Sequence, residues 1–304
     1  MSLTVRTIGE VGLIARMAKR LGRVPSSVRV GIGDDAAVLA GPGGARLLFA
    51  SDMLVEGVHF TRRAVPARWI GWKALACNVS DIVAMGGTPR WAVVSLGLPP
   101  ATPVRFVEAL YDGLARCARR FKMAVVGGDT VRAPQVVVDV AILGTVEPRH
   151  LTLRRGARVG DVLFVTGRLG GSLTSGRHAR FVPRLDEARA LTRRVRIRAM
   201  MDLSDGLASD LWQMSRASGV VLRVDVARIP VARAAGGVHH ALMDGEDFEL
   251  LFAVARRAAP RVPRRIGACP VTPIGSAIRR GVGVELFERD WCIRPLIPTG
   301  FRHF

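Results

Sequence analysis

The 304-residue chain is poor in cysteine and lacks long apolar runs. Its four cysteines, Cys77, Cys117, Cys269 and Cys292, are widely spaced and form no Cys-x-x-Cys pair, which argues against a zinc knuckle or a disulfide framework. No apolar run reaches the roughly 18 residues of a membrane-spanning helix, and the N-terminus has no signal-peptide pattern. We therefore expect reduced thiols, a cytoplasmic location and no membrane partner.

Acidic residues are also scarce, since 25 Asp and Glu stand against 45 Lys and Arg and give a formal net charge of +20. A basic surface of this kind can bind nucleic acid through the phosphates. The basic residues are spread along the chain, however, and the densest run, 193–198, contains no aromatic residue that could stack on a base. We expect no nucleic-acid partner. A non-catalytic or nucleic-acid-binding role is nevertheless kept as one of three hypotheses for this chain.

The usual signatures of phosphate-binding and hydrolytic enzymes are missing. The sequence contains no G-x-x-x-x-G-K-[ST] loop, no HRD and DFG pair, no H-E-x-x-H and no G-x-S-x-G. The glycine-rich stretch 167–172 follows a predicted strand and could either cradle a phosphate or form a simple turn. Any phosphate chemistry in this chain would therefore depend on this loop or on residues outside the usual signatures.

Length and hydrophobic spacing indicate two domains built from helices and strands. Helices are predicted at 8–21, 69–84, 104–121 and after Asp205. Strands are predicted at 47–50, 91–98, 123–126, 135–146, 162–166, 220–226, 249–254 and 271–274, the first of them ending at Ser51 and Asp52. Turn residues at 147–150 place the boundary near 148, which gives domains 1–148 and 149–304. The expected fold class is α/β, with mixed sheets.

The few carboxylates are grouped in short motifs rich in glycine, alanine, serine and apolar residues. These motifs are GIGDDAAVL (31–39), SDMLVEGVHF (51–60), CNVSDIVAMGG (77–87), VGGDT (126–130), MMDLSDGLASDL (200–211) and MDGEDFELLF (243–252). Carboxylates that gather in apolar surroundings repel one another, so a cation must offset their charge. Singly, Asp35 could form a turn and Asp205 could cap a helix. Together the motifs predict a site for a hard divalent cation such as Mg²⁺, which also binds nucleotide phosphates.

Longer segments around these motifs match a known family in its own order. The segments are GIGDDAAVL (31–39), SDMLVEGVHF (51–60), GWKALACNVSDIVAMGGTPRWAVVSLGLP (71–99), VVGGDTVRAP (125–134), LRRGARVGDVLFVTG (153–167), MDLSDGLASDL (201–211), GEDFELLF (245–252) and GFRHF (300–304). The chain in this way resembles the thiamine-monophosphate kinase family of the AIR-synthetase superfamily. EGVHF, NVSDIVAMGG and the terminal GFRHF resemble that family more than AIR synthetase itself or the hydrogenase-maturation relatives.

The resemblance implies an enzyme that moves the γ-phosphoryl of ATP onto thiamine monophosphate and gives thiamine diphosphate and ADP, with several Mg²⁺ ions. It also implies a homodimer in which the sheets of the N-terminal domains form a β-barrel across the dimer. A C-terminal α/β domain completes each subunit, and the nucleotide lies in the cleft between the domains. The alternative is a superfamily kinase or ligase that acts with ATP on another small phosphorylated or carboxylated metabolite.

The resemblance also implies roles for single residues. The metal ligands would be Asp35, Ser51, Asp52, Asp81, Asp129, Asp202 and Asp205. The ATP contacts would be Gly128, Asp129, Arg154 and Ser204, and the substrate contacts would be His59, Glu246 and Phe301. Phe301 would stack on the pyrimidine, and Asp129 and Asp205 are the candidates closest to a catalytic role. The acceptor is already a phosphate anion, so no strong general base is expected.

Four features depart from the family pattern, most of them on the acceptor side. Ala50 stands where a hydroxyl is frequent, so one metal contact would be lost or passed to a carbonyl. Asp244 replaces a usual glycine before Gly245, and Arg302 replaces a commonly acidic residue. The segment 171–183 is shorter than its family counterpart and is expected to lack a helix. We expect the ATP and Mg²⁺ half of the site to follow the family more closely than the acceptor half.

Overall fold

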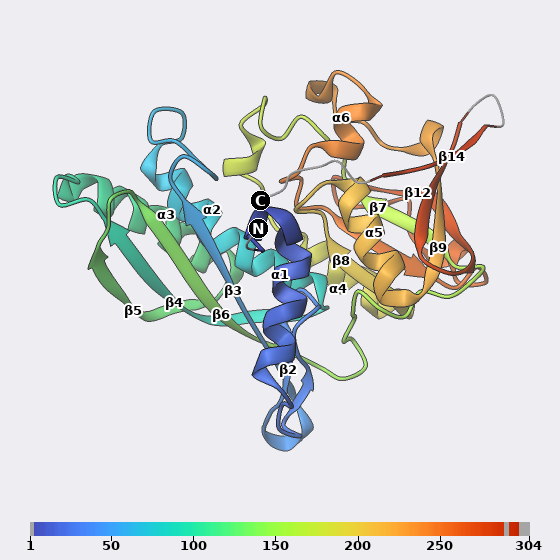
Figure 1. Cartoon of the computed structure of the whole chain (residues 1–304), viewed down its shortest axis with the longest axis horizontal. Helices are drawn as coiled ribbons and strands as arrows, with labels where there is room; N and C mark the ends of the chain where they lie inside the picture. The colour runs from blue at the N-terminus through green and yellow to red at the C-terminus, as the bar shows by residue number, and fades with distance from the viewer. Residues whose placement is uncertain (1–2, 289–291, 298–304) are drawn as a thin grey trace.

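The structure is a computed structural model that describes residues 3–288 and 292–297 and consists of two α/β halves, each built on a mixed sheet (Figure 1). The first half contains α1 (Val5–Leu21), β1 (Val28–Val30), β2 (Ala37–Ala40), β3 (Arg46–Val55), α2 (Ala67–Ala84), β4 (Thr88–Leu98), α3 (Val104–Phe121), β5 (Ala124–Arg132) and β6 (Val137–Val146). The second half contains β7 (Val162–Thr166), α4 (Leu185–Arg194), β8 (Ile197–Asp202), α5 (Leu207–Ser218), β9 (Val220–Asp225), α6 (Val238–Met243), β10 (Leu250–Val254), β11 (Arg265–Ile266), β12 (Cys269–Arg280), β13 (Gly283–Phe287) and β14 (Ile293–Pro295).

The first sheet is open and has the strand order β1-β2-β3-β6-β4-β5, with β1 and β5 at its edges. Helix α2 packs on one face, against β3, β6 and β4, and α3 packs on α2. The strands alternate accordingly: Val138, Val140 and Ile142 of β6 are fully buried under the helices. The other face carries exposed apolar side chains, which are Phe49, Met53, Trp91 and Val93. We call these four residues the outer apolar face.

Helices α2 and α3 approach closely because each carries a glycine at their contact. A Cβ on Gly71 would lie 1.9 Å from the Leu110 carbonyl oxygen, and one on Gly113 would lie 1.8 Å from the Arg68 carbonyl oxygen. Any larger residue at either position would push the helices apart. The close packing leaves α2 buried on nearly all sides, between the sheet and α3. Polar groups on α2 therefore need partners from other elements.

The second half surrounds its own apolar core. Its sheet has the order β14-β13-β9-β12-β7-β10-β8, with β11 paired to β12. The helix predicted after Asp205 is confirmed as α5, and Leu207, Leu211 and Met214 are buried in this core as their spacing indicates. The connection between β6 and β7 joins the two halves, and the predicted boundary at 148 lies within it.

Strands β3 and β5 run further than the sequence predicted, and this changes where motif residues point. Strand β3 does not end at Ser51 and Asp52 but continues to Val55, because β6 pairs with it along its whole length. Strand β5 likewise runs through Gly128 and Asp129, paired with β4. Since successive side chains alternate between the faces of a sheet, Ser51 and Asp52 point to opposite sides.

The helices also show where other predictions from the sequence agree with the structure and where they differ. The predicted helix 8–21 starts earlier, at Val5, and contains Gly9 with a left-handed φ of 64°. Within 171–183 there is no α-helix, as expected, and only a 3-10 turn at Arg177–Ala179. Within residues 3–288 and 292–297, none of the helices combines the length and apolar character needed to cross a bilayer.

Candidate active site

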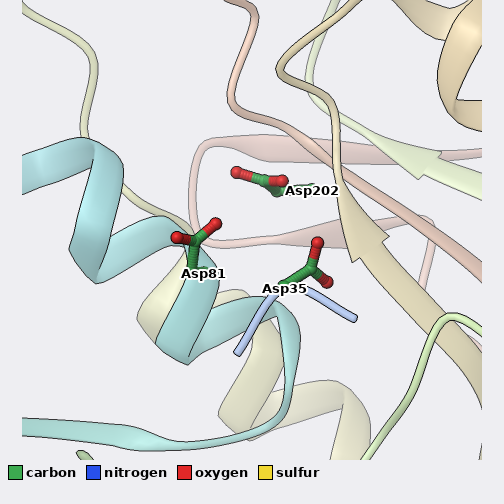
Figure 2. A group of neighbouring side chains, drawn as sticks. All are labelled: Asp35, Asp81 and Asp202. Atoms are coloured by element: carbon green, nitrogen blue, oxygen red, sulfur yellow. The ribbon is translucent and has the colours of Figure 1, made fainter. Parts of the chain in front are cut away.

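Three carboxylates from distant parts of the chain meet between the two halves. Asp35 lies in the turn before β2, Asp81 on α2 and Asp202 at the end of β8. One oxygen of each lies within 4.8 Å of the others. Figure 2 shows the three side chains gathered around one small space, each carried by a different element. The sequence placed all three among the metal ligands, and the fold brings these three together.

The first half is tied to the second directly at this cluster. Ser80, next to Asp81 on α2, donates a hydrogen bond of 2.5 Å from its hydroxyl to Asp202 Oδ2. Asp202 is 2% exposed and Asp35 is 8% exposed. Strand β8 is at the edge of its sheet that faces α2, so the end of the strand delivers Asp202 to the helix. The site therefore exists only when both halves are packed together.

Burial and mutual repulsion make these carboxyl groups hard to ionise. Burial, followed by the charge of Asp35, raises the pKa of Asp202 to about 8. Burial also raises the pKa of Asp52 to about 6, again with Asp35 as the largest neighbouring charge. The pKa of Asp81 lies well above its ordinary value for the same two reasons, with Asp52 and Asp202 as neighbours. A bound cation would remove this penalty.

Arg154 is the cation beside the cluster. Its guanidinium donates from Nε at 2.8 Å and from Nη2 at 2.5 Å to Asp35 Oδ1, and from Nη1 to Gln213 Oε1. Its backbone N–H donates to both carboxylate oxygens of Asp34. The charge of Asp35 raises the pKa of Arg154 despite its burial. Arg154 thus offsets part of the negative charge and holds Asp35 in place.

The donor set fits a hard divalent cation. Both guanidinium bonds of Arg154 go to Asp35 Oδ1, and the buried second oxygen, Oδ2, has no hydrogen-bond partner in the described part of the chain. A buried carboxylate oxygen without a partner is costly unless a cation or water occupies its free side. Asp81 and Asp202 supply further carboxylate oxygens at the same place. Three converging oxygens of this kind are ligands for Mg²⁺ rather than for a soft metal.

The raised pKa values give a pH dependence for the stability of the metal-free protein. In the folded state Asp34 and Asp52 have pKa values of about 6 and Asp202 of about 8, against an ordinary value of 3.8. Between the ordinary pKa of 3.8 and the raised values, these groups hold protons in the folded protein that they have already lost in the unfolded chain. The stability of the folded protein therefore falls as pH rises through this range. We expect the melting temperature in EDTA to decrease from pH 5 to pH 9. Mg²⁺ should reverse part of this loss, most strongly at high pH, because it needs ionised ligands. A melting temperature in EDTA that rises over this range would contradict the prediction.

Two further predicted ligands, Asp52 and Asp205, lie near the cluster, and a third, Ser51, points away from it. Asp205 and Asp35 are close enough to raise the pKa of Asp52. Gln213 Nε2 donates to Asp205 Oδ2 at 3.3 Å. Ser51 instead faces the other side of β3, where its hydroxyl donates to Asp139 Oδ1 at 3.0 Å.

Gly128 and Asp129 lie on the far edge of the first sheet, exposed on β5. Asp52 on β3 is aligned with Gly128 through β6 and β4, so three strand spacings, or roughly 14 Å, separate them. Gly128 also has a steric reason to be glycine, because a Cβ there would lie 1.8 Å from the Val94 carbonyl oxygen. Within one chain these two residues do not meet the three-carboxylate cluster.

The predicted acceptor residues gather around a buried lysine. Lys73 of α2 donates to both oxygens of Glu246, at 2.5 Å and 2.7 Å, and to the His59 carbonyl oxygen at 3.0 Å. His59 Nδ1 accepts from the backbone N–H of Val55. Ser204, predicted to contact ATP, offers its carbonyl oxygen to the Glu246 N–H at 2.6 Å. The predicted contact Phe301, and the departure Arg302, lie outside the described residues.

The glycine-rich loop 167–172 holds a carboxylate of the chain itself. The Gly170 N–H donates to Asp247 Oδ2 at 2.7 Å, and the Ser172 hydroxyl donates to Asp247 Oδ1 at 2.6 Å. Of the departures, Asp244 accepts from the Gly171 N–H at 3.2 Å and so joins the same loop. Ala50 lies inside β3 and packs against the apolar core between α2 and the first sheet.

Sequence reasoning missed several polar residues that shape the site. Lys73 fell within a quoted segment, but its pairing with Glu246 depends on contact between the halves. Gln213 bridges Arg154 and Asp205 and gave no signal, because a glutamine on a helix is ordinary. Asp210 is fully buried with one oxygen unpartnered among the described residues, and its pKa lies well above the ordinary value through burial and the nearby Asp205. A charged residue on the buried face of an amphipathic helix was the available clue to Asp210.

The two halves match two family models, described as AIR synthase related protein, N-terminal domain, over residues 33–146 and C-terminal domain over 158–286. The fold and site thus define a two-domain AIR synthase-related α/β protein. A protein from Rhodopirellula baltica named thiamine-monophosphate kinase is 37% identical over 317 residues, covering 97% of each chain. One of that name from Aquifex aeolicus is 34% identical over 330 residues, covering 99% of this chain and 100% of its own. A solved structure described as AaThiL complexed with AMPPCP and TMP has a TM-score of 0.87 and 31% identity, with both chains covered completely. The chain belongs to the thiamine-monophosphate kinase family.

Proposed function

We infer that this chain transfers the γ-phosphoryl of ATP to thiamine monophosphate and so forms thiamine diphosphate and ADP. The observation that carries this function is the meeting of Asp35, Asp81 and Asp202 between the halves of a chain that belongs to the kinase family. The related structure described as AaThiL complexed with AMPPCP and TMP contains an ATP analogue and TMP, which supports the same pair of substrates for this chain. Transfer of a phosphoryl group from one phosphate to another needs cations that neutralise the phosphate oxygens and a separate place for the acceptor. The carboxylate cluster and the acceptor residues would provide these two parts.

The chain's own residues hold and orient the reactants in this proposal. Asp35, Asp81 and Asp202, with Asp52 and Asp205 beside them, would hold Mg²⁺, and Ser51 and Asp129 stay in the proposed ligand set. When bound, Mg²⁺ would neutralise phosphate oxygens and orient the nucleotide. Arg154, Gly128 and Ser204 are the proposed ATP contacts, and Arg154 keeps Asp35 turned so that Oδ2 is available. His59, Glu246 and Phe301 are the proposed contacts of thiamine monophosphate.

A product assay tests this function. The purified protein is incubated with ATP, Mg²⁺ and thiamine monophosphate, and thiamine diphosphate and ADP are measured by chromatography. We expect the two products in equal amounts and none of them in EDTA. Nucleotide binding without thiamine diphosphate would favour the alternative, a superfamily kinase or ligase for another small phosphorylated or carboxylated metabolite. Salt-sensitive binding to nucleic acid without affinity for ATP would support the third hypothesis instead.

The proposal includes a homodimer that completes the site. Gly128 and Asp129 are exposed at the free edge of the sheet, far from Asp52, and the outer apolar face lies on the same sheet. Free sheet edges and exposed apolar patches are typical of surfaces that pair with another chain. Pairing of two copies through this sheet would close a barrel across the dimer. It would also bring the partner subunit's Asp129 next to β3, the strand that carries Asp52.

The proposed setting of this enzyme is the cytoplasm. Cys77, Cys117 and Cys269 are buried free thiols. Free thiols persist in reducing compartments, which supports the proposal. Fractionation of the cells that produce the protein, with activity assayed in each fraction, would test it.

A further inference from the structure

Lys73 is a lysine with no exposed surface, in a chain whose other basic residues are mostly at the surface. It lies on α2, and all three protons of its ammonium group have acceptors. Two go to the oxygens of Glu246 and one goes to the His59 carbonyl oxygen. An ammonium group has three donors and no acceptor, so Lys73 has no proton left for a ligand. Its role is therefore to hold other groups in position.

The two groups that Lys73 holds come from opposite halves of the molecule. His59 follows β3 in the first half, and Glu246 lies 173 residues from Lys73 in the loop before β10. The family resemblance implies that both contact the acceptor. The side chain of Glu246 remains 22% exposed while Lys73 is covered. One side of the carboxylate is thus fixed by Lys73 and its other side is open.

The loop that carries Glu246 has a backbone that needs such support. Glu246 and Phe248 adopt left-handed φ angles of 64° and 49°, which are unusual for residues with side chains. The ring of Phe248 stacks on Phe181 with centroids 3.9 Å apart. Trp72, beside Lys73 on α2, donates from Nε1 to the Phe181 carbonyl oxygen at 2.7 Å. Two adjacent residues of α2 therefore hold this loop, one through Glu246 and the other through Phe181.

We propose that Lys73 is a positioning residue for the acceptor substrate, which acts by fixing the Glu246 carboxylate and the His59 backbone. The proposal rests on the proposed function, because it assigns the acceptor to the open side of Glu246. A carboxylate held from one side accepts a donor group such as the amine of an aminopyrimidine on the other. The charge of Lys73 also cancels that of Glu246, so that an acceptor bearing a phosphate is not repelled. In the described part of the chain the ammonium group of Lys73 bonds to Glu246 and His59 and not to the carboxylate cluster, so its effect should fall on the acceptor and not on ATP.

Steady-state kinetics of Lys73→Met, Glu246→Gln and the double variant test this role. Methionine retains the length and apolar stem of lysine but leaves Glu246 without its ammonium partner. We expect Lys73→Met to raise the KM for thiamine monophosphate at least about tenfold, while the KM for ATP stays within about twofold. The double variant should resemble Glu246→Gln alone, because Lys73 acts through that residue. Lys122→Met, the same change on α3's C-terminal side, is the matched control and should leave both constants unchanged.

Hydrogen exchange separates failure of this inference from failure of the proposed function. In Lys73→Met we expect faster exchange in residues 244–249 and unchanged exchange in the turn that contains Asp35. If that loop is unaffected, or if both KM values rise together, or if the two substitutions add, Lys73 is not a positioning residue for the acceptor. If the loop loosens as expected but the unmodified protein makes no thiamine diphosphate, the assignment of Lys73 to the loop stands and the proposed acceptor is wrong.

Discussion

Asp81→Asn should abolish thiamine diphosphate formation and at the same time raise the melting temperature of the metal-free protein. Asp81 shares a small space with Asp35 and Asp202, and its pKa lies well above the ordinary value because of burial and these neighbours. Asparagine has nearly the same shape but cannot ionise, so it removes the cost of either charging this carboxyl group beside its neighbours or protonating it on folding. Without metal the repulsion therefore falls, whereas with metal a ligand is lost. We expect turnover to fall by about 10²–10³-fold or more, since a group that stabilises the transition-state charge is removed.

The two opposite effects are measured on the same preparation. Turnover is followed with ATP, Mg²⁺ and thiamine monophosphate, and thermal unfolding is recorded in EDTA at pH 8. The matched control is Glu285→Gln, a carboxylate outside the site that accepts a hydrogen bond from Arg223 at 2.8 Å and pairs with Arg279 at 2.6 Å; these two cations hold the pKa of Glu285 below its ordinary value despite partial burial. Loss of that partnered carboxylate should lower the melting temperature and leave turnover near normal. If Asp81→Asn lowered the melting temperature in EDTA as Glu285→Gln is expected to do, the three carboxylates would not form a self-repelling cluster.

The sequence pattern marked the three carboxylates of the cluster among a larger set of acidic residues, but it did not predict which of that set lie together. Asp35, Asp81 and Asp202 stand in motifs whose small and apolar flanks do not suit solvated surface acids, and this pattern marked them. Which of the seven predicted ligands lie together depends on how the end of β8 meets α2. Ser51 illustrates the limit: it is adjacent to Asp52 in sequence, yet β3 continues through both and turns Ser51 toward Asp139. Strand length decides this, and strand length is set by pairing with β6.

Buried cations were the harder part of the site to foresee. Apolar spacing predicted α2 correctly, but a helix covered on nearly all sides has no spacing that tells which of its polar residues face a partner. Lys73 and Glu246 belong to different halves, and only the packing of one half on the other brings them into contact. The same holds for Arg154, which the sequence assigned to ATP and which the fold also uses to hold Asp35. In both cases a cation within the chain offsets charge that sequence reasoning left to metal alone.

Mixing two inactive variants, Asp129→Ala and Asp52→Ala, should restore activity if each site is built from two subunits. In one chain Asp129 is at the far edge of the sheet from Asp52, so we expect the partner subunit's Asp129 to serve the site that contains Asp52. A mixed dimer then has one site with both residues intact and one site with neither. Random mixing in equal amounts makes about half of the dimers mixed, which predicts about a quarter of the normal activity.

The result distinguishes the shared site from a site within one chain. If Asp52 and Asp129 of the same chain cooperated, each subunit of a mixed dimer would lack one of them, and no activity would return. The variants carry different affinity tags, are unfolded together and refolded, and the doubly tagged dimers are isolated before the assay. The control is each variant alone, prepared with both tags and unfolded and refolded in the same way, and it should remain inactive. Isolated mixed dimers without activity would contradict the shared site. A failure to isolate any dimer would contradict the homodimer itself, which is proposed because the exposed edge of β5 and the outer apolar face are surfaces that pairing would cover.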